Sequence, residues 1–337
     1  MWRWLGTGAL TCASLLPPLP SPVGLMPSGM DSLVLIVQPQ MGSGLDSVSP
    51  AKLEAALVLA LELSGRFTAV AALSRDSVVE ELRSRGQEPT AIAVAQRLGC
   101  GRMLFARADR LQHLVRVEVV FRFGENFAQE QRGRGFALVR YAHRTGGRLL
   151  LDPALLEAAQ RAIAVAVGDS MLYAAKEEPF CVVPAPLLVV GGLEYRDTGE
   201  LRRWDWFARK VVTSYDAVLQ LIDTLRRHPG YVVCDIDSRD TLFARAGLME
   251  PENYRPPSPV ELRLLRAAEV DYYVWGTIER VPEGARIRLQ LARLQGDARN
   301  AWLEPVREVE GSVAEDSVVL FRKQLRQLGG ELLWAAP

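Results

Sequence analysis

The feature that most constrains the fold is an internal repetition at a spacing of roughly 160 to 170 residues. The sharpest match joins Ser74-Arg75-Asp76-Ser77 to Ser238-Arg239-Asp240-Thr241, which agree in residue type and in their place after a short apolar run. Repeats of solenoid proteins are far shorter than this spacing. The repetition therefore predicts two tandem copies of one small domain.

The first copy begins with alternating strand and helix patterns. The apolar run Leu33 to Val37 predicts a strand covered on both faces. Ser49-Pro50 supplies an N-cap and a first-turn proline for a helix that Gly65 ends. Phe67 to Ala72 predicts a second strand, and Ser74 is expected to cap the helix that follows.

The rest of the first copy adds a helix, three strands and a long closing helix. The helix is expected from Thr90 to Leu98 and leads into a strand at Met103 to Ala106. From Val115 to Phe123 apolar and polar residues alternate, which is typical of a strand with one buried face. Phe136 to Ala142 predicts another strand, and Asp152-Pro153 opens the closing helix.

The second copy repeats this order after a segment that contains three prolines. Ser258-Pro259-Val260-Glu261 has the sequence of a capping box and opens the helix before the third strand. The other expected elements are strands at Leu187 to Val190, Tyr231 to Cys234, Tyr272 to Gly276 and Ile287 to Leu291, and helices at about Lys210 to Arg227 and Ala314 to Leu328.

The predicted fold class is α/β (α+β), with two tandem copies of a small mixed-sheet domain and helices packed on each sheet. Each copy reads β-α-β-α-α-β-β-β-α. The expected domains are a leader at residues 1–30, a first domain at 31–175, a linker at 176–186 and a second domain at 187–335.

The amino terminus predicts export. Arg3 precedes an apolar stretch from Leu5 to Leu16 and a proline-rich segment, a pattern typical of a secretory signal and too short to span a bilayer. Ala9 to Cys12 loosely matches a lipoprotein box, so anchoring through Cys12 is a weaker expectation. No later segment predicts a membrane-spanning helix, and the periplasm or cell envelope is the expected location.

The stretch from Leu57 to Phe105, followed by the alternating strand near Val117, resembles the amino-terminal domain of TolB and the related CsgG-type and LpoB-type envelope lipoproteins. The same outline recurs from Leu221 to Leu291. This resemblance implies an exported scaffold that binds other envelope proteins and has no catalytic residues or cofactor. A propeller like that of TolB is not indicated, because no repeat of about 40 residues occurs.

Composition and motifs argue against several function classes. Forty lysines and arginines balance 40 aspartates and glutamates, so a nucleic-acid partner is not expected. His113, His143 and His228 lack a second histidine or a cysteine at metal-ligand spacing. The sequence also lacks the common serine hydrolase, P-loop and zinc-protease motifs. We therefore expect a protein that is not an enzyme.

Asp235, Asp237 and Asp240 form the densest carboxylate cluster, between a predicted strand and a predicted helix. A hard cation is bound by such oxygen ligands, which leaves a metal-dependent hydrolase or transferase as an alternative function. The competing interpretation is a polar strand end joined to a capped helix. A cytoplasmic ligand-sensing module is a third alternative if the leader is not a signal.

Arg203, Trp204, Trp206 and Phe207 are the candidate partner-binding residues. Tryptophan and arginine often anchor protein interfaces, and the first copy has no counterpart of this segment. The alternative is that these rings fold back over the core.

Three further patterns have simpler explanations. Arg132-Gly133-Arg134-Gly135 is interpreted as a turn entering a strand, in preference to an RNA-binding element. Gly191-Gly192 is a weak match to a phosphate loop. Cys100, Cys181 and Cys234 allow at most one disulfide, and Cys100 and Cys234 are expected to be buried.

Overall fold

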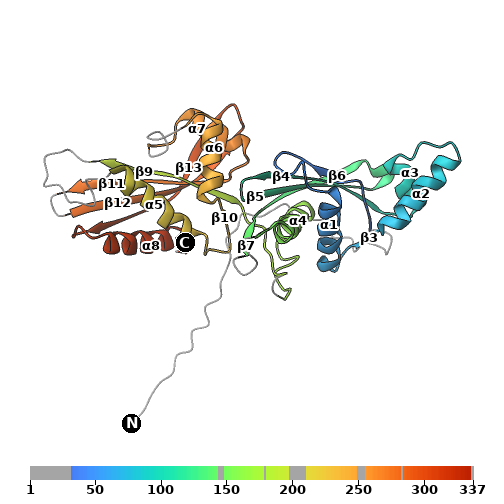
Figure 1. Ribbon diagram of the computed structural model, residues 1–337, viewed down its shortest axis with the longest axis horizontal. Coiled ribbons are helices and arrows are strands. Elements are labelled where there is room, and N and C mark those ends of the chain that lie inside the picture. The colour runs from blue at the N-terminus through green and yellow to red at the C-terminus, as the bar shows by residue number, and fades with distance from the viewer. Residues whose placement is uncertain are drawn as a thin grey trace, which may run out of the picture.

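Two α/β units lie end to end along the long axis of the molecule (Figure 1). The first unit runs from β1 to α4 and the second from β9 to α8. Each is a mixed sheet with helices packed on it, as the sequence predicts. The computed structural model describes residues 32–142, 148–177, 180–196, 210–248, 255–281 and 284–334.

The first unit contains four helices, a main sheet and a small two-stranded sheet among its described residues. Its elements in chain order are β1 (Leu33–Ile36), β2 (Gln40–Met41), α1 (Pro50–Ser64), β3 (Thr68–Ala69), α2 (Ala72–Ser84), α3 (Ala91–Arg97), β4 (Arg102–Leu111), β5 (Leu114–Phe123), the 3-10 helix η1 (Glu125–Phe127), β6 (Gln129–Leu138), β7 (Arg140–Ala142), β8 (Arg148–Leu150) and α4 (Leu151–Val167).

The second unit repeats this order without counterparts of β2, η1, β7 and β8 in the part of it that is described. Its elements are β9 (Leu187–Arg196), α5 (Lys210–Leu225), β10 (Val232–Val233), α6 (Ile236–Arg245), α7 (Pro259–Ala267), β11 (Tyr272–Val281), β12 (Gly284–Gly296), β13 (Ala301–Val313) and α8 (Val318–Trp334).

The two main sheets have the same topology. The strand order is β3-β1-β4-β5-β6 in the first unit and β10-β9-β11-β12-β13 in the second, and β2 also pairs with β4. In each sheet the strand that opens the unit is parallel to both neighbours, and the last three strands form an antiparallel meander. The predicted order of elements is therefore confirmed in both copies.

An arginine at the same helical position makes the same contact in both units. Pairing of Leu33 with Thr68 corresponds to pairing of Leu187 with Val232, which aligns β1 with β9. In this register Arg75 of α2 donates to the Ile36 carbonyl at 3.4 Å. Its counterpart Arg239 of α6 donates to the equivalent carbonyl of Val190 at 2.8 Å.

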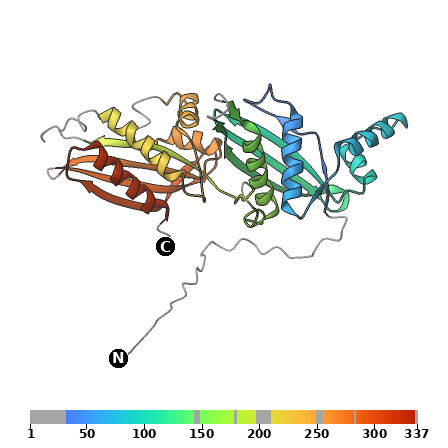
Figure 2. The same cartoon turned by 60° about the horizontal axis from the view of Figure 1, so that its bottom comes forward.

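The first and last helices of each unit cover one face of its sheet (Figure 2). Leu57 of α1 and Ile163 of α4 pack on Val117 in the first core, where all three are buried. The second core is built in the same way from α5 and α8. The other two helices of each unit pack on the opposite sheet face. As Figure 1 shows, α6 and α7 lie beside the first unit, whereas α2 and α3 lie at the far end of the molecule.

Local capping signals explain several helix boundaries. Ser49 caps α1 with Pro50 at its start, Gly65 ends it in the left-handed conformation, and Ser258 and Glu261 form the capping box of α7, as predicted. The prediction that Ser74 caps a helix is wrong. Because β3 has only two residues, α2 begins at Ala72, and Ser74 lies inside its first turn.

Arg132 to Gly135 lies inside β6, so its interpretation as a turn is wrong. A Cβ on Gly133 would lie 2.0 Å from the Ala162 carbonyl oxygen, and one on Gly135 would lie 2.2 Å from that of Ala158. The glycines therefore allow α4 to approach the strand backbone closely. The strand predicted from Phe136 consequently begins earlier, at Gln129.

The closing helix of the second unit begins at Val318, four residues later than predicted from Ala314, because β13 extends to Val313. The predicted order includes this strand, but no residue range was predicted for it, and its fifth residue is Pro305. Proline is tolerated there because β13 is an edge strand, and the register with β12 shifts beside it, between Leu291 and Ala292.

Candidate functional site

The candidate site is the junction where the β4–β5 turn of the first unit meets the start of α6. Gln112 has a positive φ of 50° in this two-residue turn, which places His113 toward the second unit. The His113 backbone N–H donates to the Ser238 hydroxyl at 3.3 Å, and the same hydroxyl lies 3.1 Å from the Leu111 carbonyl oxygen. The Ser238 hydroxyl therefore lies against both ends of the turn, and its one proton is shared between the Leu111 carbonyl and the closer Asp235 carboxylate.

Asp235 is the N-cap residue of α6, and its position follows from the local sequence. Its carboxylate accepts the Ser238 backbone N–H at 3.0 Å and the Ser238 hydroxyl at 2.7 Å. These bonds satisfy donors that the first turn of a helix leaves without a partner. The carboxylate is buried and fixed in orientation before any ligand is considered.

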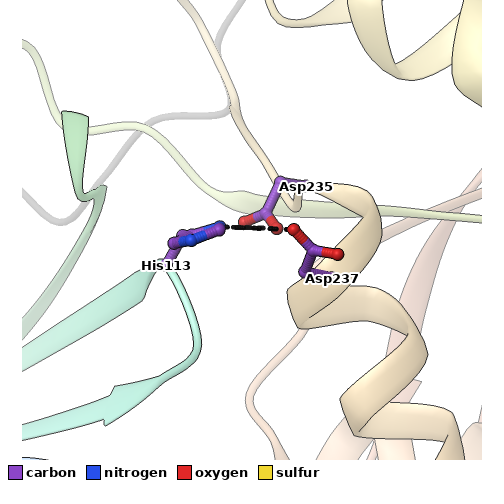
Figure 3. Close-up of side chains that lie close together, drawn as sticks. All are labelled: His113, Asp235 and Asp237. Carbon is purple, nitrogen blue, oxygen red and sulfur yellow. Dashed lines mark hydrogen bonds and ion pairs between the residues drawn. The ribbon is translucent and has the colours of Figure 1, made fainter. Parts of the chain in front are cut away.

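The imidazole of His113 points toward two carboxylates of the second unit, which both lie on the same side of it (Figure 3). Its Nδ1 is 3.4 Å from an oxygen of Asp235 and 3.7 Å from an oxygen of Asp237. Asp235 is buried, whereas the Asp237 side chain is 65 % exposed. The shorter separation is within hydrogen-bond distance and the longer one is not. Both separations suit ligands that share one divalent cation.

The structure gathers a different set of residues from the predicted one. Asp235 and Asp237 lie together, but Asp240 forms an ion pair with Arg239. His113 joins the group although it lies 122 positions before Asp235 in the sequence. No local spacing rule identifies such a residue, because only the packing of the two units brings it there.

A cleft of about 940 Å³ opens beside this group, and both units line it. The first unit contributes Arg140, Glu157 and Arg161, which mix charges of both signs. The second contributes residues of α5 and of the segment from His228 to Asp237. The cleft is therefore a feature of the two units together.

Two ion pairs hold the other side of the junction. Arg116 on β5 lies 2.8 Å from Glu269, and Arg134 on β6 lies 2.7 Å from Asp271. Asp271 also accepts the Leu187 backbone N–H at 3.0 Å, which ties the start of β9 to the same contact. Partly buried, hydrogen-bonded pairs of this kind fix relative orientation better than exposed pairs do.

An apolar cluster closes the junction between these polar contacts. Leu114 and Phe136 of the first unit pack with buried residues of the second unit. The second-unit members include Leu187, Val189 and Leu242. Desolvated apolar contacts flanked by ion pairs are the pattern of stable protein interfaces.

A buried polar cluster in the second unit was not predicted. The Tyr273 hydroxyl donates to Glu261, and the Arg239 guanidinium donates to the Val190 and Gly191 carbonyl groups. A Cβ on residue 191 would collide with the Tyr273 ring. Gly191, part of the weak match to a phosphate loop, lies inside β9 and leaves space for this tyrosine of β11. Burial raises the pKa of Glu261, although the bonds from Tyr273 and Ser258 oppose the shift.

The candidate partner-binding residues Arg203, Trp204, Trp206 and Phe207 lie outside the described residues, as does Cys12. The three described cysteines are free thiols.

Two of the three thiols, Cys100 and Cys234, are buried as expected, and Cys181 is exposed. Burial raises the pKa of Cys100 to about 11 and raises that of Cys234 as well. Both buried thiols therefore stay protonated near neutral pH and act as packing residues.

Comparison with known proteins gives similarity of fold alone. No protein-family model matches the chain, and no curated protein matches its sequence. The LpoB C-terminal domain from Salmonella enterica is 14% identical, with 39% of this chain and 84% of that chain covered and a TM-score of 0.29.

The PelC dodecamer from Paraburkholderia phytofirmans is 11% identical, with 41% of this chain and 89% of that chain covered and a TM-score of 0.26. TolB from Acinetobacter baumannii is 15% identical, with 45% and 29% covered and a TM-score of 0.21. The chain thus has a weak fold-level resemblance to envelope proteins. Scores this low carry no functional argument.

Within the described parts of the chain, none of the helices combines the length and the apolar character that crossing a bilayer requires.

Proposed function

We propose that the chain is an exported, non-enzymatic envelope protein that binds another protein and acts as a scaffold or assembly factor. Export is supported by the signal-like pattern of residues 1–30. Protein binding is supported by one observation. One sheet face of the second unit is covered by the first unit, and the equivalent face of the first unit is open.

This face, which we call the docking face, is formed in the second unit by β9, β10 and α6. The first unit covers it with Leu114 and Phe136. The equivalent face of the first unit is formed by β1, β3 and α2. The following residues are half-buried there, with buried second-unit counterparts in parentheses: Leu33 (Leu187), Val70 (Cys234), Val78 (Leu242) and Val79 (Phe243).

The open docking face has the properties of a protein-binding surface. Leu73 at the start of α2 is 83% exposed, and Ile92 on α3 is also exposed. A groove of about 580 Å³ runs between α2, α3 and the end of β1. Neither of these two side chains lines the groove. Exposed apolar groups and grooves are each typical of interaction sites.

The polar residues of the junction argue for a partner other than a second copy of this chain. At the positions of Asp235, Glu269 and Asp271, the first unit has Ala71, Gly99 and Gly101. If the β4–β5 turn of a second copy approached this face, its arginines would therefore find none of the carboxylates that hold the present junction. The expected partner is another envelope protein that inserts apolar side chains into the open docking face.

Arg203, Trp204, Trp206 and Phe207 supply a second candidate contact. The preceding strand β9 ends at Arg196, which pairs with Glu279 of β11. That end of β9 is opposite to Leu187, the end tied to the first unit. Binding through the tryptophans and binding through the docking face are thus separable by mutation.

The proposed contact is tested with Leu73→Arg in the full chain, by quantitative cross-linking to envelope proteins in the native membrane fraction. Val319→Arg is the matched control, because Val319 is also an apolar helix residue with 68% exposure. We expect Leu73→Arg to weaken one specific cross-link by about tenfold. Equal cross-linking by the two variants would contradict the proposal.

Three further measurements complete the test. Loss of the cross-link in Trp204→Ala/Trp206→Ala, with the melting temperature unchanged, would move the contact to the tryptophan segment. Concentration-dependent self-association in ultracentrifugation would identify a second copy as the partner. Fractionation with sequencing of the amino terminus tests export, and an intact leader in the cytoplasm would favour the ligand-sensing alternative.

A metal-dependent reaction is the second candidate function, and the approach of His113 to Asp235 and Asp237 is the observation that favours it. A cation there would take one ligand atom from each residue. Against this, both Asp235 oxygens already accept bonds from Ser238. Calorimetry with magnesium, calcium, manganese and zinc tests for metal binding. Absence of binding heat at millimolar metal would exclude the metal-dependent reaction.

A further inference from the structure

A second cavity, of about 310 Å³, lies in the junction on the side where β4 faces α6. Its base is apolar and comes from both units. Leu114 and Phe136 line it from the first unit, and Leu187, Val189 and Leu242 line it from the second. All five side chains are buried. The cavity volume is near the lower end of ligand pockets, which span about 300 to 1,000 Å³.

The mouth of this cavity is strongly basic. Arg107, Arg110, Arg116 and Arg245 line it, and Asp109 is the one carboxylate among the described lining residues. Asp109 accepts hydrogen bonds from Arg107 and Arg116. Partial burial acts to raise the pKa of Asp109, but these two bonds outweigh it and the pKa is lowered. Asp109 therefore remains ionised and partly neutralises this pair of arginines.

The other two arginines retain positive charge toward the cavity mouth. Arg110 donates to the Gln112 carbonyl group, which carries no charge. Arg245 is exposed and has no ion-pair partner within the described ranges. Arg116 is further paired with Glu269, which does not line the cavity. The excess of guanidinium groups at the mouth thus comes from Arg110 and Arg245.

We propose that this junction cavity binds a small amphiphilic anion, namely a medium-chain aliphatic carboxylate. The hydrocarbon chain would replace water against the apolar base, which is favourable. The carboxylate would lie between Arg110 and Arg245, because guanidinium groups bind carboxylates in a bidentate fashion. The volume limits the ligand to a chain of medium length, and the basic mouth disfavours cationic head groups.

Such a ligand would contact both units at once. It would bind only when the first unit is seated on the docking face of the second, so binding stabilises the junction by mass action. The inference does not depend on the proposed envelope partner, whose contact surface is at the other end of the first unit.

The test is isothermal titration calorimetry of the full chain with decanoate, decanol and decyltrimethylammonium, all below their micelle concentrations. We expect decanoate to bind at least about tenfold more tightly than decanol, and the cation not to bind. Decanoate should also raise the melting temperature. Equal affinities for decanoate and decanol, or no binding of decanoate, would overturn the proposal without any variant.

Variants locate the binding to this cavity. Arg110→Ala/Arg245→Ala should weaken decanoate binding about tenfold, whereas Arg132→Ala on the same unit, outside the cavity, should leave it unchanged. Ala268→Trp places an indole in the cavity and should abolish binding. Unchanged decanoate affinity in a folded Ala268→Trp protein, checked by its melting curve, would place the ligand elsewhere and contradict the inference.

Discussion

Helix α6 of the second unit and helix α2 of the first occupy the same place in the same topology, yet their surroundings differ. Ser238, Arg239, Leu242 and Phe243 of α6 are buried, whereas Leu82 is the buried residue of α2. Part of the difference comes from the neighbour, since the first unit packs on α6, whereas among the described residues α2 packs only on elements of its own unit. One local sequence pattern can therefore serve a packed interior in one unit and an open surface in the other.

The residues around the two helices have diverged with their surroundings. Beside Arg239 the second unit has Gly191, Glu261 and Tyr273, which build the buried polar cluster. The register-equivalent residues of the first unit are Val37, Ala91 and Met103, which belong to an apolar cluster. Burial of α6 is thus accompanied by a hydrogen-bonded polar network, and exposure of α2 by a simple apolar one.

The largest expected difference in stability between the two helices is at their core-facing positions, where it tests the comparison most directly. Phe243→Ala should lower the free energy of unfolding by about 3 to 5 kcal/mol, since a fully buried ring leaves a cavity. Val79→Ala, at the equivalent half-buried position, should cost about 1 kcal/mol. Chemical denaturation measures both, and similar losses would mean that α2 is as tightly packed as α6.

The matched arginines sharpen the comparison. Arg239 is 1% exposed and Arg75 is 20% exposed. Arg239→Ala leaves two buried carbonyl groups without donors and should cost about 3 kcal/mol. Arg75→Ala breaks its pair with Glu54 near the surface and should cost about 1 kcal/mol. A larger loss for Arg75→Ala in urea titrations would reverse the assignment of the packed and open faces.

The closing helices offer a third matched pair. Gly135→Ala sets a methyl group against the backbone of α4 and should cost about 2 kcal/mol, because backbone cannot move aside. Gly311→Ala, at the equivalent position, meets the flexible Gln324 side chain and should cost less than about 1 kcal/mol. Equal melting temperatures for the two variants would show that α4 shifts as easily as a side chain.

The smallest expected effect is a difference in pH dependence. Burial raises the pKa of Glu261 above its value of 4.5 in a free side chain, so the folded state holds this proton more tightly than the unfolded state. Its contribution to stability is complete below pH 4.5 and is lost as the pH rises through the folded pKa. As the pH rises from 4.5 through the folded pKa of Glu261, the wild type should therefore lose stability relative to Glu261→Gln.

Glutamine at position 261 keeps the capping box, which isolates the effect of charge. Glu88→Gln, on an exposed segment of the first unit, serves as the control and should run parallel to wild type. The measurement is the free energy of unfolding across the pH range. A constant difference between wild type and Glu261→Gln at all pH values would contradict the expected role of burial.

The sequence was sufficient for the order of elements because local signals specify it. Ser49-Pro50, the capping box at Ser258 and the alternation near Val117 each depend on neighbouring residues alone. The repetition of this order then indicated two copies. Errors arose where tertiary packing decides, as at Gly133, whose role depends on the approach of α4, and at β13, whose proline depends on an edge position.

The junction could be predicted only in part for the same reason. Asp235 and Asp237 were selected from their clustering, and the structure brings them together. His113 could not be selected, because a histidine in a turn has no signal until another unit packs against it. The absence from the first unit of counterparts to Glu269 and Asp271 was readable from the repeat once the register was known.

Pro305 in β13 has a consequence for how the molecule avoids unwanted assembly. A thirteen-residue strand at the rim of a sheet would ordinarily invite strands from neighbouring molecules to add to it. Proline removes one amide donor, and the adjacent shift in register twists the backbone. An incoming strand would lose alignment at Pro305, so this edge of the sheet disfavours fibre growth.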